Sequence, residues 1–204
     1  MRKIIGSLIT VVLVLLFTGI GTSANFTYAE ASQRSMPNVD RPDLRLATYK
    51  SAVYMFQFSN VAPGSSGSSR NRLINAGNQT GQLGVHFSEV TNTPGTTGEY
   101  ADSNGDLGAK AEIAVYIDLD MSGNWNSGDI GLKSDGTIYH NPMALDYTAL
   151  NGYGGVKWDV ITMLASAEVH VIIMWRIPIT VGNEIQGDSA SFDITFALKP
   201  AVVL

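Results

Sequence analysis

The stretch that decides the fold class reads Val181-Gly182-Asn183-Glu184-Ile185-Gln186-Gly187-Asp188-Ser189-Ala190-Ser191-Phe192-Asp193-Ile194-Thr195-Phe196-Ala197-Leu198. Its second half alternates apolar and polar or small residues, which is the period of a β-strand with one buried face. Its first half has two glycines and short polar side chains that can bond to nearby main chain, so we expect a tight corner there. The chain therefore ends in a β-sheet.

The same strand signals recur through the chain. They predict strands within residues 46–58, 83–87, 113–119, 137–140, 156–161 and 169–177. The last of these is apolar on both faces, so we expect it in the middle of its sheet. Asn141 followed by Pro142 predicts helix over 142–150, and we expect at most one or two short helical turns in all. The fold class predicted is all-β.

The N-terminus has the pattern of a secretory signal peptide. Arg2 and Lys3 precede an apolar run over 4–20, and Thr22-Ser23-Ala24 offers the small residues of a cleavage site. We predict a cleaved signal peptide over 1–24, with Thr27-Tyr28-Ala29 as the second-choice site. An uncleaved membrane anchor is the alternative, for which the run is barely long enough. The protein is thus expected outside the cell or at its surface, in contact with the membrane only during export.

The net charge argues against one class of binding partner, and the cysteine content bears on how the domain is stabilised. Cleavage removes two basic residues and no acid, so the net charge changes from −5 to −7. An acidic exported protein is a poor candidate for binding nucleic acid. The chain has no cysteine, and a domain of this size can bury enough apolar surface to fold without disulfides. We expect one domain over 46–204, preceded by an extended segment and tether over 25–45 that Pro37 and Pro42 interrupt.

Catalytic motifs are missing from the sequence. The three histidines (His86, His140 and His170) are separate, and there is no His-Glu-x-x-His run, no cysteine nucleophile and no Gly-x-Ser-x-Gly elbow. We expect His86, on the polar face of a strand, and His170, on an apolar strand, to have a surface or hydrogen-bonded core role rather than to be ligands. We predict that the protein is not an enzyme, and a secreted hydrolase is the least favoured alternative.

One constellation of residues resembles the first half of a calcium loop. It has oxygen-bearing side chains around a glycine: Asp118, Asp120, Ser122, Asn124 and Asp129. A hard cation needs six or more oxygens, and alternate loop residues can converge on one point. The glutamate that closes a full loop is absent, so Asp129 or a second turn with Asp102, Asn104 and Asp106 would complete the site. Calcium is the one cofactor predicted, and a solvated acidic turn is the alternative.

Asn78, in Asn78-Gln79-Thr80, is a candidate glycosylation site.

Several of these features together resemble the TasA and camelysin family of secreted matrix-fibre proteins, which has archaeal relatives that form bundling pili. The similar features are the Ala24-Asn25-Phe26 start, the turns at 60–64 and 75–78, the acidic segment over 99–106, and above all Asn183–Ser189 with Phe192–Phe196. Residues 33–45 do not match the family. Because no metalloprotease motif is present, the protease activity attached to the camelysin name is not carried over.

The resemblance implies a jelly-roll-like β-sandwich whose subunits polymerise head to tail into a pilus or biofilm matrix fibre. It implies donor-strand complementation, in which an extended N-terminal donor strand completes the sheet of the next subunit; here that strand is Asn25, Phe26, Thr27, Tyr28 and Ala29. The expected partners are copies of the same chain, with lateral bundling between filaments. The alternative is a monomeric, calcium-stabilised surface module for a ligand such as glycan, using Trp125, Tyr153 and Trp158.

Overall fold

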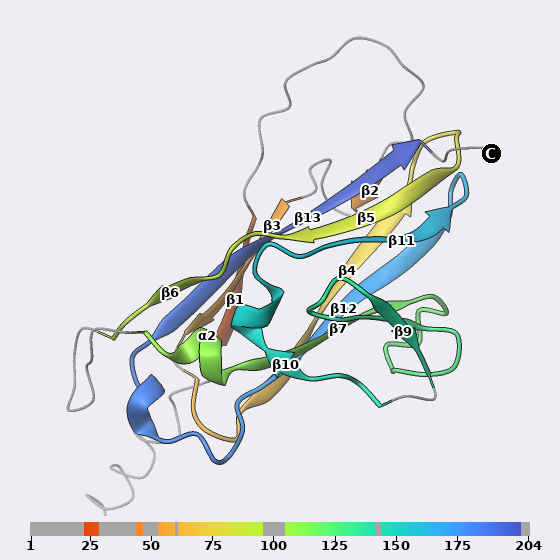
Figure 1. Cartoon of the computed structure of the whole chain (residues 1–204). Coiled ribbons are helices and arrows are strands. Elements are labelled where there is room, and N and C mark those ends of the chain that lie inside the picture. Colours follow the sequence, from red (N-terminus) through yellow and green to blue (C-terminus); the bar gives the residue numbers. More distant parts are fainter. Residues whose placement is uncertain are drawn as a thin grey trace, which may run out of the picture.

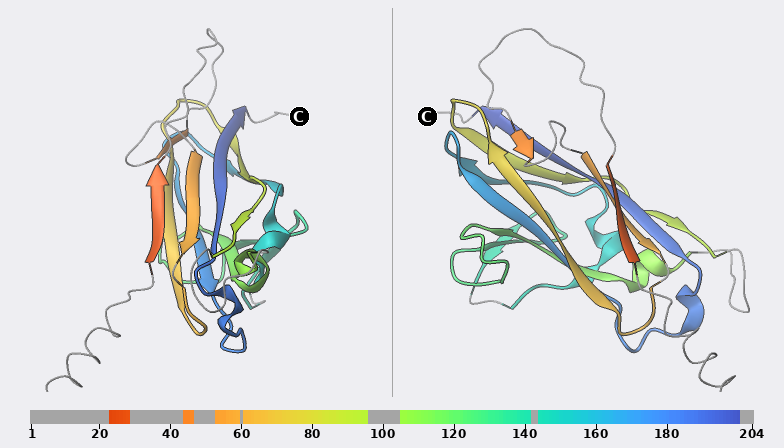
Figure 2. Two further views of the ribbon diagram at one scale, coloured as in Figure 1. Left: turned by 90° about the vertical axis from the view of Figure 1, so that its left-hand side faces the viewer. Right: turned by 180° about the vertical axis from the view of Figure 1, so that it is seen from behind.

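Two antiparallel β-sheets face each other as an all-β sandwich in the computed structural model (Figures 1 and 2). The structure describes residues 23–28, 44–46, 53–59, 61–95, 105–141 and 144–200. Residues 1–22 of the signal peptide predicted over 1–24, most of the predicted tether and the acidic segment 96–104 lie outside these ranges. Within them, no helix combines the length and the apolar character that crossing a bilayer requires.

The first sheet holds the closing strand of the chain near its centre. Its order is β1 (Ser23–Tyr28), β3 (Val53–Ser59), β13 (Ser189–Pro200), β5 (Gly81–Phe87) and β11 (Lys157–Met163). The short β6 (Thr91–Thr93) also pairs with β13. The strand predicted from Phe192 to Leu198 is therefore confirmed, with β3 and β5 on either side.

The second sheet is built around β12. Its order is β2 (Leu44–Leu46), β4 (Ser66–Asn75), β12 (Glu168–Arg176), β7 (Glu112–Asp118), β8 (Ile130–Leu132) and β9 (Ile138–His140), with β10 (Thr148–Ala149) paired to β7. The central position predicted for 169–177 is confirmed. The chain alternates between sheets from β3 to β4, β5 and β7 and again from β11 to β13, which is the winding of a jelly roll.

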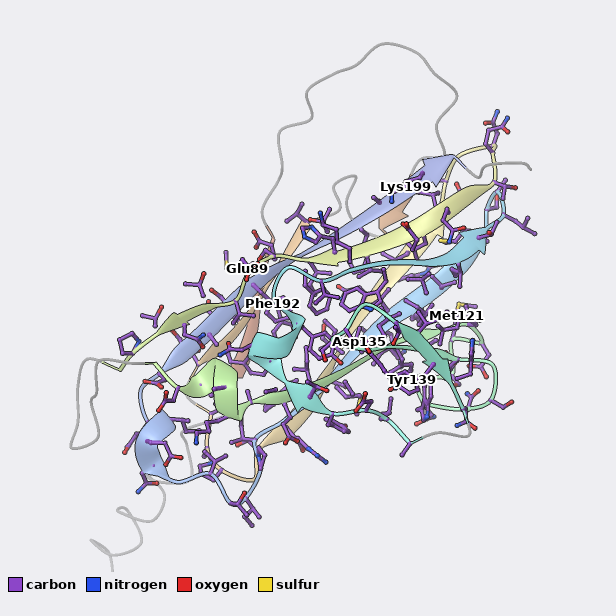
Figure 3. All side chains as sticks on the ribbon, in the orientation of Figure 1. Glu89, Met121, Asp135, Tyr139, Phe192 and Lys199 are labelled. Carbon is purple, nitrogen blue, oxygen red and sulfur yellow. The ribbon has the colours of Figure 1, made fainter. Side chains whose placement is uncertain are left out.

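Inward-facing side chains from both sheets make one apolar core. Phe192 of β13, labelled in Figure 3, lies between Phe56 and Phe87, at ring-centroid distances of 5.2 and 4.9 Å. The first sheet contributes alternate residues of β3, β5 and β13, and the second sheet contributes alternate residues of β7 and β12. Among the buried core residues are Phe58, Val85, Ile113, Val115, Ile117, Val171, Ile173, Ile194 and Phe196.

β4 is a strand that the sequence did not predict, because its first half is polar. Its inward-facing positions there are Gly67 and Ser69, across from Trp175 and Ile173 of β12. A Cβ atom at position 67 would lie 2.8 Å from the indole ring of Trp175. Small residues on β4 thus make room for large ones on β12. The hydrophobic residues that predict a strand are therefore visible in the sequence of β12 and are missing from the first half of β4.

Three single helical turns occur among the described residues, where the sequence predicted at most two. They are α2 (Leu107–Lys110), η1 (Leu150–Tyr153) and η2 (Asn183–Ile185). The helix predicted over 142–150 is wrong in position: residues 144–147 are irregular, and Thr148 and Ala149 form β10. Pairing of Thr148 with Ile113 of β7 satisfies the backbone there, so sheet pairing overrides the local Asn-Pro start signal.

The corner before β13 is held by a buried carboxylate. Asp188 is 3% exposed and accepts hydrogen bonds from the N–H groups of Gly95 (2.8 Å) and Asp106 (2.7 Å). The predicted role of this corner, tying down main chain through short polar side chains, is confirmed. The bonds reach across more than eighty positions of sequence, so the corner also anchors the chain on both sides of segment 96–104.

Candidate functional site

The acidic loop, residues 119–129, joins β7 to β8 and folds over the outer face of its own sheet. Tyr116 and Asp118 point away from the core, yet they are 1% and 0% exposed. Tyr116 donates its hydroxyl to the carbonyl of Gly123 (3.2 Å) and packs edge-on against Trp125 at 5.5 Å. Leu119 was predicted to continue the strand, but the strand ends at Asp118 and Leu119 is exposed.

Three of the predicted metal ligands meet in this loop. Carboxylate oxygens of Asp118, Asp120 and Asp129 all lie within 4.8 Å of one another. Asp118 and Asp129 are buried, whereas Asp120 is exposed. Asp106 does not join them, because it precedes α2 at the opposite end of β7 from the loop residue Met121 (Figure 3). The other two residues of that predicted turn, Asp102 and Asn104, lie outside the described residues.

Asp118 organises the first half of the loop. Its two oxygens accept hydrogen bonds from the N–H groups of Ser122 (3.2 Å) and Gly123 (2.8 Å). Asp120 accepts a second bond from the Ser122 N–H at 3.0 Å. Gly123 has φ +79°, a left-handed conformation that glycine adopts without strain. The sharp turn at this glycine brings the loop back toward Asp118.

Asp129 closes the loop as its twelfth residue, counted from Asp118. Its carboxylate accepts hydrogen bonds from the N–H groups of Leu119 (3.2 Å) and Asn126 (2.9 Å). Of the two ways to complete the site that the sequence left open, the structure places Asp129 beside the other carboxylates. The shorter aspartate stands here where a calcium loop usually has glutamate.

Asn126 is a site residue that the sequence reasoning missed. Its side-chain amide donates to Asp120 Oδ2 (3.1 Å), Ser122 Oγ (2.9 Å) and the backbone oxygen of Asn124 (3.2 Å). Three oxygens from alternate residues therefore converge on one point. Asn124 contributes its backbone oxygen to this point rather than the side chain that we predicted. The signal that could have found Asn126 is the same alternation, continued by one step.

Burial and mutual repulsion perturb the titration of the cluster. Burial raises the pKa of Asp129, and the charges of Asp118 and Asp120 raise it further. The N–H of Ser122 holds the pKa of the exposed Asp120 below its usual value. Burial, followed by the charges of Asp118 and Asp129, raises the pKa of Tyr116 to about 12. The loop thus concentrates negative charge in a place where water screens it poorly.

His170 lies beside the cluster on β12, directly across from Asp118 of β7. Its side chain is 10% exposed, and its Nδ1 is 3.7 Å from Asp118 Oδ2. The prediction for His170 was a surface or hydrogen-bonded core role; the side chain is buried, but its Nδ1 has no hydrogen-bond partner among the described residues. The imidazole comes from fifty-two positions away in the sequence, so only the β7–β12 pairing reveals it.

The predicted donor strand lies at the edge of the first sheet. Asn25, Phe26, Thr27 and Tyr28 pair with Gln57, Phe56, Met55 and Tyr54 of β3. Figure 2 shows β1 beside β3, and no other strand of the described residues pairs with the outer edge of β1. Ala29, the last residue predicted for the donor, is outside the described residues. The strand next to the donor segment is β3, and β13 is one position farther into the sheet.

The aromatic side chains considered for a glycan surface do not form an exposed face. Tyr153 and Trp158 are buried in the core. Trp125 is half-buried and packs between Tyr116 and Tyr139. The candidate glycosylation residue Asn78 is exposed in the turn between β4 and β5. Its modification remains a prediction.

Comparison with protein-family models and with curated protein sequences finds no match to this chain. The resemblance to the TasA and camelysin family therefore rests on the residues quoted above.

Proposed function

We propose that this protein is a secreted, non-enzymatic structural subunit of an extracellular filament, assembled head to tail by exchange of β1. The observation that carries the proposal is the place of β1 in the sheet. Among the described strands it pairs with β3 alone, at the edge of the sheet. Removing β1 breaks one strand pairing and leaves the β3–β13 ladder in place.

The connection to β1 is long enough for exchange between molecules. Residues 29–43 separate β1 from β2, which is anchored on β4. Fully extended, such a segment spans about 50 Å at roughly 3.3 Å per residue. The pairing that β1 makes with β3 of its own chain can be made with β3 of a neighbour by the same backbone groups. Exchange of identical elements therefore costs little free energy.

The unoccupied edge that exchange would create also favours assembly. Without β1, the outward N–H and C=O groups of β3 would have no strand partner, and such an edge readily pairs with another chain. A subunit that gives its β1 to one neighbour and receives β1 from another makes a contact that does not close on itself. Repetition of that contact generates a filament, with the lateral faces left for bundling.

A cysteine pair tests this proposal. Thr27 and Met55 are directly opposite in the β1–β3 register, and the chain has no cysteine of its own. Opposed residues of neighbouring strands lie about 4.5–5.5 Å apart, which a disulfide can bridge. We expect the double variant Thr27→Cys with Met55→Cys, oxidised under assembly conditions, to give a ladder of covalent oligomers on a non-reducing gel.

The controls separate exchange from pairing within one chain. Proteins that carry only one of the two cysteines, with tags of different size, are mixed and oxidised. A heterodimer that forms between them requires β1 of one molecule on β3 of another. A protein that lacks residues 25–36 should fold as a monomer and form no filaments in electron micrographs. Oxidised monomer alone from the double variant, together with normal filaments from the deletion, would refute the proposal.

A further inference from the structure

We infer that Asp118, at the end of β7, and the acidic loop together form a complete twelve-residue calcium site, with His170 as the residue that positions its first ligand. This inference is independent of filament assembly, since β1 and β3 belong to the other sheet. The proposed ligands are oxygens of Asp118, Asp120, Ser122, Asn124, Asn126 and Asp129, at positions one, three, five, seven, nine and twelve of the loop.

The separation of the carboxylates fits a single ion. Oxygens that each lie 2.3–2.6 Å from one calcium ion are at most about 5 Å apart. The carboxylate oxygens of Asp118, Asp120 and Asp129 lie within 4.8 Å of one another. The amide of Asn126 stands where oxygens of residues 120, 122 and 124 converge. If the side-chain amide is flipped, so that its oxygen and nitrogen exchange places, its own oxygen faces the same point.

The charge of the cluster is poorly compensated by the protein. Within the described part of the chain, none of the three carboxylates forms an ion pair with a lysine or arginine. Arg70 lies against Gly123 and still makes no such pair. Two buried carboxylates and a third close by repel one another strongly where water is excluded. A divalent cation at their common point removes that repulsion.

His170 supplies an independent sign of a ligand. A buried imidazole nitrogen without a hydrogen bond is costly, and such groups are rare in folded proteins. Its Nδ1 faces Asp118 Oδ2 at 3.7 Å, which is too long for a hydrogen bond. Both oxygens of Asp118 are instead held by N–H groups of the loop. When an ion draws one oxygen inward, the other can accept a hydrogen bond from His170, as ligating carboxylates commonly do from a neighbouring donor.

Binding would join three strands at one end of the sandwich. Asp118 ends β7, Asp129 precedes β8, and His170 is on β12. An ion held between them ties the loop to the outer face of the sheet. The set of hard oxygen donors favours calcium over zinc, which prefers nitrogen and sulfur, and over magnesium, which keeps most of its waters.

Calorimetric titration of the purified protein with Ca²⁺ tests the site. We expect one ion per chain, with a Kd of about 10⁻⁵–10⁻³ M, the range from sensor loops to extracellular modules. Asp120→Asn should weaken binding by at least about tenfold, since it removes a ligand charge. Asp120 is exposed, so this variant is expected to fold, and thermal melting in EDTA verifies that. Asp193→Asn, which changes another exposed acid, on β13, is the matched control and should bind like the unaltered protein.

A second measurement reads His170 directly. In NMR spectra, the ring signals of His170 should move on addition of Ca²⁺, while those of His86, on β5 of the other sheet, should not. Absence of both heat and a melting shift with folded protein at about 10 mM Ca²⁺ would overturn the site. So would equal weakening by Asp120→Asn and Asp193→Asn, or binding of Zn²⁺ without binding of Ca²⁺. Calcium binding that leaves the His170 signals in place would overturn the role given to the imidazole.

Discussion

Replacement of Asn75 by aspartate is expected to destabilise the fold far more than its small change in shape suggests. Asn75 is 0% exposed and is the last residue of β4, at the turn that leads to β5. Its side-chain amide donates to the carbonyl oxygens of Gln79 (2.8 Å), Met163 (3.1 Å) and Leu164 (3.0 Å). One side chain thus joins the β4–β5 turn to the β11–β12 turn, at one end of the sandwich.

The magnitude follows from what each substitution leaves behind. Asn75→Ala removes the hydrogen-bond donor of one buried carbonyl and of two partly buried carbonyls. We expect the free energy of unfolding to fall by about 2–3 kcal/mol, since an unsatisfied buried polar group costs about 1–3 kcal/mol. Asn75→Asp puts a carboxylate oxygen against the same three carbonyls. We expect a loss of about 4–5 kcal/mol at pH 7, because an unpaired buried charge is added to the lost bonds.

The aspartate variant should also acquire a distinctive pH dependence. Its environment favours the protonated carboxyl, so the pKa of Asp at position 75 would be higher in the folded state than in the unfolded chain. The unfolded state then releases its proton first, and stability falls by up to about 1.4 kcal/mol per pH unit as pH rises above about 4. Lowering the pH to about 4 should therefore recover part of the loss.

Urea unfolding followed by tryptophan fluorescence, at about pH 4 and pH 7, measures these differences. Asn78→Asp makes the same chemical change on an exposed residue of the same turn and should cost less than about 0.5 kcal/mol. If Asn75→Asp were within about 1 kcal/mol of this control at pH 7, the assignment of Asn75 as the donor joining the two turns would be wrong.

Three further outcomes follow from the core, the corner and the outer face. Phe192→Ala should lower the free energy of unfolding by about 3–5 kcal/mol, because the ring lies between two others in the core; denaturant titration measures this. Asp188→Ala should cost about 2–4 kcal/mol, since it leaves two backbone N–H groups without an acceptor, and faster hydrogen exchange at Gly95 and Asp106 would report the loss. Stability should fall as pH rises from about 10 to about 12, because Tyr116 keeps its proton in the folded state after the unfolded chain has lost it. Denaturant titration across this pH range should show a smaller fall in Tyr116→Phe, and an equal fall in that variant would contradict the role given to Tyr116.

The predictability of the two candidate sites differs for a physical reason. A loop site is made by residues that are close together in the sequence. The spacing from Asp118 to Asp129 was therefore enough to predict that their carboxylates belong to one metal site. The contribution of His170 depends on a strand pairing between β7 and β12 that no local pattern states. The burial of Tyr153 and Trp158, which removed them from a glycan surface, likewise depends on strands that arrive from elsewhere in the chain.

The sequence by itself determined the all-β class, most of the strands and the corner before β13. Alternation and turn chemistry are properties of neighbouring residues, so they can be read without knowledge of the fold. Only the tertiary structure decided that polar β4 is a strand, that the acidic loop covers the outer face of its sheet, and that β1 lies on β3. Burial depends on which residues meet across strands, as Gly67 meets Trp175, and that is a property of the packed chain rather than of any single stretch.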